Sequence, residues 1–261
     1  MSSETNNEKS VTARAISVLD AFDASHRRQT LASIARRANL PQSTTHRFLN
    51  QLVEEQALIR CSDGLYEIGS KLWRLGLLAS VHSDLREIAL PYMEDIFQLG
   101  VDVVQIAVLD GMRCMVVDRI AGSRSIGVLS KPGVRLPLHA TSVGKVLLAN
   151  AGLELENAAL NSLERITDQT ITAPEILRKQ LQEIRALDFA TTKEELALGA
   201  ISVAVPIRGY GGKVIAALGL VIPATQRNAN HLVPVLRVTS DALSKKLVAY
   251  GISDSVVIKH S

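Results

Sequence analysis

The stretch that decides the fold runs from Thr30 to Leu52 and reads TLASIARRANLPQSTTHRFLNQL. From Leu31 its apolar residues recur at i, i+3, i+4 and i+7, the spacing that gives a helix one apolar face, and Thr30 is a residue type that caps helix starts. The triplet Asn39-Leu40-Pro41 interrupts the pattern, because asparagine tolerates left-handed backbone and proline disfavours helix in the preceding residue. Since proline also suits the first turn of a helix, the stretch predicts two short helices joined by a tight turn.

The second of these helices has an inward and an outward face. The positions at helical spacing that we expect to pack inward are Thr45, Phe48, Leu49 and Leu52. The outward positions carry short hydrogen-bonding side chains and one arginine, the residue types that contact base edges and phosphates. With one arginine of the first helix, the residues expected to contact DNA are Arg36, Gln42, Ser43, Thr44, His46 and Arg47.

Charge along this part of the chain favours the same interpretation. From Ala24 to Val53 there are five arginines and two histidines but no aspartate or glutamate. A cluster of cations without acids is typical of DNA-binding surfaces, because neutralising phosphates releases condensed counterions. The alternative is an ordinary helical hairpin with a solvated basic face.

Length and composition suit two domains. The chain has 261 residues, of which 47% are hydrophobic and 3% aromatic, and its net charge is +3. Cys61 and Cys114 lie far apart with no CxxC pair, so we expect buried or idle thiols and neither a disulfide nor a metal site. Residues 1–10 are polar and predict a disordered arm, with no apolar run suited to a signal peptide or a membrane span. We therefore expect a cytoplasmic protein that makes no membrane contact.

The elements around the helix pair predict a winged helix over residues 11–69. An amphipathic helix begins near Val11, and a hairpin with an Asp63-Gly64 turn occupies 58–68. Residues 70–84 are crowded with apolar side chains on more than one face, which indicates a linker helix that packs against a second subunit. Trp73, the only tryptophan, suits either that interface or a core position beneath the wing.

The remaining residues, 85–254, predict an α+β domain with an antiparallel sheet that holds a small ligand. Hairpins in β-branched residues are expected over 101–120 and 201–222, with a further strand over 125–129. An irregular segment that begins at 136 leads into a helix that ends near 148. Further helices are expected over 85–97, 153–163, 175–187 and 229–250.

Enzyme chemistry has no positive signal. The segment Ser142-Val143-Gly144-Lys145 lacks the first glycine and the final hydroxyl of a phosphate-binding loop, and no Gly-x-Ser-x-Gly elbow occurs. Glu194 and Glu195 are adjacent, so we expect a solvated loop or a helix start. His139 is expected to be a structural histidine bonded to backbone. We assign no catalytic residue and no cofactor.

Several separated motifs, in order, resemble IclR-family transcription regulators. In the N-terminal part they are Thr12-Ala13-Arg14-Ala15-Ile16-Ser17-Val18-Leu19, Leu31-Ala32-x-Ile34-Ala35-Arg36, Leu40-Pro41-x-Ser43-Thr44-x-x-Arg47, Tyr66-x-Ile68-Gly69 and Leu75-Gly76. In the C-terminal part they are Leu109-Asp110-Gly111, Gly133-x-Arg135-x-Pro137-Leu138-His139-Ala140-Thr141-x-x-Gly144-Lys145, Glu194-Glu195-x-x-x-Gly199 and Ala204-x-Pro206-Ile207. The resemblance implies a DNA-binding winged helix, a linker helix and a GAF-like effector domain. It also implies a homodimer or a homotetramer on double-stranded promoter DNA.

The resemblance also implies an effector pocket. By motif its residues would be Ser125, Val128, Leu136, Ser142, Val143, Thr192, Ser202, Gly219 and Val221. Relatives that bind small keto acids carry an acid at the place of Thr192 and a cysteine at that of Ser202. Because most of that polar set is replaced here, the sequence favours a larger or more apolar effector, such as an aromatic catabolite, alongside the organic acids of the family.

Two alternatives stay open at this level. The chain could be a small-molecule enzyme that carries an N-terminal interaction module, although it would need a titratable pair in the pocket. The helix pair could instead dock a protein, in which case binding to DNA would be absent or insensitive to salt. The sequence favours a ligand-responsive DNA-binding regulator over both.

Overall fold

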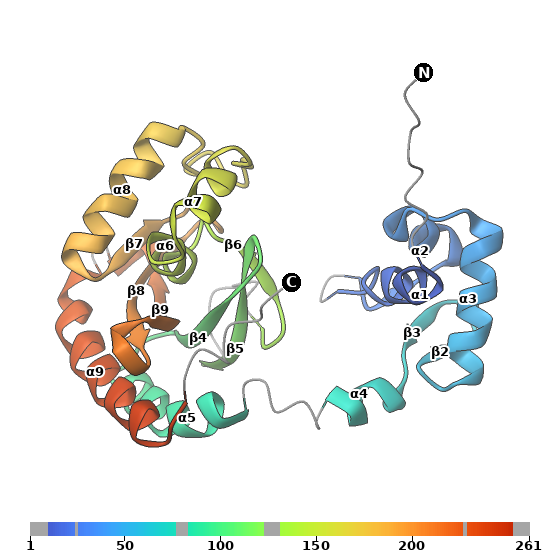
Figure 1. Cartoon of the computed structure of the whole chain (residues 1–261), viewed down its shortest axis with the longest axis horizontal. Helices are drawn as coiled ribbons and strands as arrows, with labels where there is room; N and C mark the ends of the chain where they lie inside the picture. The colour runs from blue at the N-terminus through green and yellow to red at the C-terminus, as the bar shows by residue number, and fades with distance from the viewer. Residues whose placement is uncertain (1–9, 24–25, 77–82, 123–130, 227–228, 253–261) are drawn as a thin grey trace. The chain divides into compact units, whose positions relative to one another are not determined.

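The computed structural model describes residues 10–23, 26–76, 83–122, 131–226 and 229–252 (Figure 1). The chain divides into two compact units, Met1–Ser80 and Val81–Ser261. The first is a helix-turn-helix domain and the second carries an antiparallel sheet flanked by helices. This confirms the predicted fold class. No helix among the described residues is both long enough and apolar enough to cross a membrane.

The N-terminal unit is a three-helix winged domain. Its elements are α1 (Val11–Leu19), β1 (Arg28–Gln29), α2 (Leu31–Ala38), α3 (Gln42–Glu54), β2 (Leu58–Arg60), β3 (Tyr66–Ile68) and α4 (Ser70–Gly76). The strands form one antiparallel sheet in the order β1-β3-β2. The sequence predicted the hairpin of β2 and β3, but it did not predict β1, whose two residues are too few to show a pattern.

Local chemistry sets the limits of the helices. The Thr30 side chain accepts a hydrogen bond from the Ser33 amide and caps α2, as predicted. Asn39 ends α2 in the left-handed conformation with φ of 53°, also as predicted. Ser10 was expected in the disordered arm, but its side chain caps α1 by accepting from the Ala13 amide.

The C-terminal unit is built on a six-stranded antiparallel sheet in the order β6-β5-β4-β9-β8-β7. Its strands are β4 (Val103–Asp110), β5 (Arg113–Ala121), β6 (Arg135–Pro137), β7 (Ala190–Lys193), β8 (Ala200–Arg208) and β9 (Val214–Pro223). Its helices are α5 (Ser83–Phe97), α6 (Ser142–Ala149), α7 (Leu153–Leu160), α8 (Pro174–Leu187) and α9 (Val233–Ala249). Short 3-10 turns occupy Tyr210–Gly212, Ala224–Gln226 and Asn230–Leu232.

Helices cover both faces of this sheet, and each side has its own apolar core. One core joins α5 and α9 to large side chains of β4, β8 and β9. The other joins α6 and α8 to small residues of the sheet, including Ala107, Ala204 and Ala217. A Cβ on Gly219 would lie 2.6 Å from Cγ1 of Val143, so α6 can approach the sheet only because this position is glycine.

The sequence predicted both hairpins of this sheet but not its two edges. The edge strand β6 overlaps the start of the segment that was expected to be irregular, and β7 was not predicted. The strand expected over 125–129 lies outside the described residues. The predicted linker helix is described only as α4 up to Gly76, and the next described residue, Ser83, begins α5. Trp73 is 64% exposed, so its interpretation as a core residue beneath the wing is wrong.

Candidate functional site

The outward face of α3 is built as the sequence predicted. Thr45, Phe48 and Leu49 are buried in the core of the winged domain, and the Thr45 hydroxyl donates to the Pro41 carbonyl at 3.0 Å. This fixes the rotation of α3 about its axis. Of the residues expected to contact DNA, four on α3 are therefore exposed, namely Gln42, Ser43, His46 and Arg47, and Thr44 is half-buried. The sixth, Arg36, lies on α2 and is exposed as well.

The arginines of this domain fall into two groups. Arg37 forms an ion pair with Asp23 and also donates to the Ala21 carbonyl, while Arg28 pairs with Asp63 and Glu67. These acids lie outside the acid-free window of the sequence, so the count of five arginines overstated the basic surface. Among the described residues, the other three arginines, Arg27, Arg36 and Arg47, have no acidic partner. Arg47 lies over the ring of Phe48, 5.7 Å from its centroid.

A second candidate site is a small cavity in the C-terminal unit, beside the N-terminus of α6. Its volume is about 30 Å³. It is lined by Gln105, Leu136, Ala140, Thr141, Thr192, Glu194, Glu195, Leu196, Ala197, Ala200, Ser202 and Val221. A cavity of this size holds one or two water molecules, so a metabolite would have to displace part of its wall.

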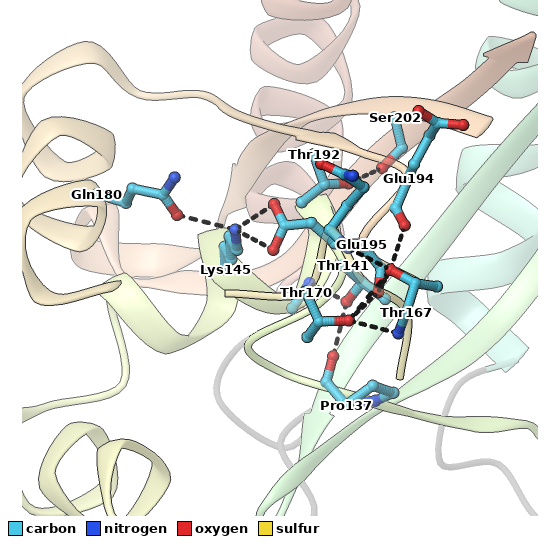
Figure 2. Close-up of polar contacts among 12 residues, drawn as sticks. Pro137, Thr141, Lys145, Thr167, Thr170, Gln180, Thr192, Glu194, Glu195 and Ser202 are labelled. Carbon is cyan, nitrogen blue, oxygen red and sulfur yellow. Dashed lines mark hydrogen bonds and ion pairs between the residues drawn. The ribbon is translucent and has the colours of Figure 1, made fainter. Parts of the chain in front are cut away.

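Register across the sheet brings these residues together. One row of paired residues runs Val103, Val221, Ser202 and Thr192 across β4, β9, β8 and β7. The next row on the same face runs Gln105, Gly219 and Ala204. Thr192 and Ser202 face each other as a cross-strand pair, with hydroxyl oxygens 2.6 Å apart (Figure 2).

The start of α6 contributes hydrogen-bonding groups to one side of the cavity. The Thr141 hydroxyl caps the helix by accepting from the Gly144 amide at 3.1 Å, and it donates to the Pro137 carbonyl at 2.9 Å. The Ser142 hydroxyl is fully buried and has no hydrogen-bond partner in the described part of the chain. A helix N-terminus carries partial positive charge and amide donors, which suits an anionic group of a ligand.

The structure brings together four of the nine predicted effector residues as cavity lining: Leu136, Thr192, Ser202 and Val221. Ser142, Val143 and Gly219 are close by, but the latter two pack against each other and none of the three lines the cavity. Ser125 and Val128 lie outside the described residues. No sequence signal marks Gln105, which belongs to none of the motifs, and Glu195 was expected in a solvated loop or at a helix start.

A buried ion pair anchors one wall of the cavity. Lys145 of α6 contacts both carboxylate oxygens of Glu195, at 2.7 and 2.8 Å, and donates to Gln180 of α8 at 2.8 Å (Figure 2). The two charged side chains are 1% and 6% exposed. Burial, the larger influence, lowers the pKa of Lys145, and the adjacent carboxylate opposes that shift. The expectation of a solvated Glu194-Glu195 pair is therefore wrong for Glu195.

Backbone geometry explains how the two adjacent glutamates separate. Glu194 has a left-handed backbone with φ of 58°, so the chain turns sharply there and the two side chains leave in different directions (Figure 2). Glu194 accepts from the Gly199 amide, whereas Glu195 reaches Lys145. Hydroxyls of Thr167 and Thr170 donate to the carbonyls of these residues, each at 2.7 Å.

The other titratable residues near the cavity have structural partners. His139 donates through Nε2 to the Glu164 carbonyl at 2.9 Å, as expected of a structural histidine, and burial lowers its pKa. Cys114 is fully buried, which raises the pKa of its thiol to about 11. Within the described ranges, no group of three or more His, Cys, Asp or Glu side chains could hold a metal ion.

Both units of the chain match models of known protein families. Residues 11–59 match the IclR helix-turn-helix domain, and residues 78–245 match the C-terminal domain of bacterial IclR transcriptional regulators. Together the two family models cover most of the chain.

Individual relatives agree with this placement. An IclR homologue from Microbacterium hydrocarbonoxydans, solved in complex with 4-hydroxybenzoate, superposes with a TM-score of 0.82 at 36% identity, covering 92% of this chain and all of that one. The transcriptional regulator TtgV of Pseudomonas putida is 31% identical over 83% of this chain and 82% of its own length. The regulator XynR of Escherichia coli is 30% identical over 79% of this chain and 83% of its own length.

Proposed function

The chain belongs to the IclR family of DNA-binding transcriptional regulators, and we propose that α3 reads its operator while an aromatic acid in the cavity beside α6 controls that binding. The observation that best supports the DNA-binding part of this proposal is the cationic outward face of α3. Arg47 is exposed there and has no acidic partner among the described residues. Arg36, Gln42, Ser43, Thr44, His46 and Arg47 are the proposed DNA contacts.

Replacing Arg47 by alanine tests this assignment. A bidentate contact to a base is worth about 1–3 kcal/mol, so affinity for DNA upstream of the protein's own gene should fall about 5- to 150-fold. Arg37→Ala is the matched control, because Arg37 already pairs with Asp23 and should affect folding of the winged domain more than DNA contact. Unchanged affinity of Arg47→Ala, measured by fluorescence anisotropy at fixed salt, would contradict the assignment.

An aromatic acid fits the chemistry of the cavity. Its lining combines Leu136, Ala140 and Val221 with a few hydroxyls, and the start of α6 offers amide donors to a carboxylate. The similar protein from Microbacterium hydrocarbonoxydans, solved with 4-hydroxybenzoate, supports an aromatic effector here. The proposed effector contacts include all nine residues predicted by motif, Ser125 and Val128 among them.

Thermal unfolding with candidate ligands tests this second part. Because a ligand stabilises the state that it binds by RT ln(1 + [L]/Kd), 4-hydroxybenzoate at millimolar concentration should raise the Tm of the C-terminal unit. Pyruvate, a small keto acid, serves as the control and should leave it unchanged. Stabilisation by pyruvate alone would refute the aromatic assignment.

Control of DNA binding requires that ligand binding alter the shape of the protein. Since the cavity of about 30 Å³ is smaller than any aromatic acid, binding must shift the population toward a form with a larger cavity. In that form the two recognition helices of a dimer would lie at a different spacing. A dimer that fits two half-sites on DNA has its recognition helices about 34 Å apart, or a multiple of that distance. This provides a mechanism without any catalytic step, and we assign no enzymatic activity.

The proposed assembly is a homodimer or a homotetramer joined in part through the linker. The exposed Trp73 and Leu75 of α4 support this, because large apolar side chains on one short helix favour contact with a partner. The proposed division is an arm over 1–10, a winged helix over 11–69, a linker helix over 70–84 and an effector domain over 85–254. Trp73→Glu should shift the protein toward monomer in light scattering, and an unchanged mass would contradict the assignment.

A further inference from the structure

Gln105 is a buried polar residue to which sequence reasoning gave no role. It lies on β4 on the sheet face that carries α6, is 4% exposed and lines the cavity. Its side-chain oxygen is buried and has no hydrogen-bond partner in the described part of the protein. Buried amide groups are nearly always bonded in native proteins, so an open one inside a cavity indicates a ligand contact.

The remaining polar side chains of the lining are already engaged. Thr192 bonds to Ser202, Glu194 accepts from the Gly199 amide, and Glu195 binds Lys145. Thr141 accepts from one backbone group and donates to another. Among the described lining residues, Gln105 is therefore the one with a buried side-chain acceptor that has no hydrogen-bond partner.

The cross-strand neighbours of Gln105 on β9 and β8 are small and apolar. Gln105 pairs in register with Gly219, which has no side chain, and the next residue in that row is Ala204. Val143 of α6 packs over Gly219, where a side chain at position 219 would otherwise lie. Neither Gly219 nor Ala204 has a polar side chain, so on β9 and β8 this row offers the amide no side-chain hydrogen-bond partner.

We propose that Gln105 recognises a hydroxyl group on the effector, which makes the effector a hydroxylated aromatic acid; this rests on the proposed aromatic function of the cavity. A side-chain amide carries an oxygen that accepts and an NH₂ group that donates. A hydroxyl matches both, since it donates to the oxygen and accepts from the nitrogen, whichever way the amide is turned. A carboxylate could only accept from the nitrogen and would leave the oxygen open.

The match between the Gln105 amide and a hydroxyl predicts which ligands the protein should prefer. A site built to bond a hydroxyl rejects an analogue that lacks it, because the buried polar group of the protein is then left without a partner. The full-length protein should therefore bind 4-hydroxybenzoate or 3-hydroxybenzoate at least 10-fold more tightly than benzoate in calorimetric titration.

Gln105→Met tests the role of the amide, since methionine has a similar length and no hydrogen-bonding group. The variant should bind benzoate about as well as the wild type does and lose the preference for the hydroxylated acids, to below 3-fold. Its ligand-free Tm should equal or exceed that of the wild type, because the substitution removes an unsatisfied buried group. The exposed Gln98→Met is the matched control and should change neither property.

Each outcome decides one part of the proposal. If the wild type binds benzoate and the hydroxybenzoates equally, or if Gln105→Met keeps the preference, the role of Gln105 is wrong while the aromatic effector stands. If no benzoate binds, the aromatic effector is wrong, and the ligand-free Tm then decides on Gln105. A Tm lowered by several degrees in Gln105→Met would show that the amide has a structural partner and would overturn the proposal.

Discussion

The buried pair of Lys145 and Glu195 gives the sharpest quantitative prediction. In Lys145→Met, the Glu195 carboxylate keeps its buried position but loses its cation, and Gln180 loses its donor. Breaking a buried ion pair by removing one partner costs about 3–5 kcal/mol, because the remaining charge is not solvated. With side chains 1% and 6% exposed, solvent screening gives little relief.

The loss should appear as a lower melting temperature of the C-terminal unit. For a domain of 150–250 residues each kcal/mol shifts Tm by about 2–4 °C, so Lys145→Met should lower Tm by roughly 6–20 °C. Differential scanning calorimetry at pH 7 measures this, with the exposed Lys179→Met on α8 as the control. The unfolding of the winged domain should not change.

The double variant Lys145→Met/Glu195→Met distinguishes the cost of an uncompensated buried charge from the cost of losing the ion pair itself. Replacing both charges by apolar side chains removes the uncompensated carboxylate and should recover most of the lost stability, since such replacements are often neutral. A cost below about 1 kcal/mol for the single variant would refute the reasoning. A double variant as unstable as the sum of its singles would refute it too.

Three further predictions concern single residues. Gly219→Ser should destabilise the protein by about 1–3 kcal/mol in urea unfolding, since its Cβ would overlap Val143; equal stability would show that α6 can move away. Native protein at pH 8 should react with a maleimide at Cys61 but not at Cys114, whose pKa of about 11 keeps it protonated, and labelling of both would contradict the burial. Burial lowers the pKa of His139 below its unfolded value, so the unfolded state binds more protons and stability should fall as pH drops through about 6.5. That loss, followed by thermal unfolding from pH 7.5 to 5.5, should be smaller in His139→Gln, and an identical profile would exclude this residue as its source.

The sequence could predict the elements whose signals are local. The cap at Thr30, the left-handed Asn39 and the apolar face of α3 each depend on residues within a few positions of one another. The two-residue strand β1 and the edge strands β6 and β7 carry no such pattern, because they form only when the rest of the sheet presents unpaired backbone groups. Their positions depend on tertiary structure.

The cavity also combines features that the sequence could predict with features that depend on tertiary structure. Leu136, Thr192, Ser202 and Val221 could be assigned by resemblance, yet Thr192, Ser202 and Val221 meet because β7, β8 and β9 pair in register. The ion pair joins Lys145 to Glu195, which are 50 positions apart in the sequence. Adjacent charged residues such as Glu194 and Glu195 are usually exposed to solvent, so their sequence pattern does not predict a buried carboxylate. Only the left-handed turn at Glu194 sends the two glutamates to different partners. The position of this buried charge in the wall of the cavity is thus specified by backbone geometry, which neither composition nor spacing records.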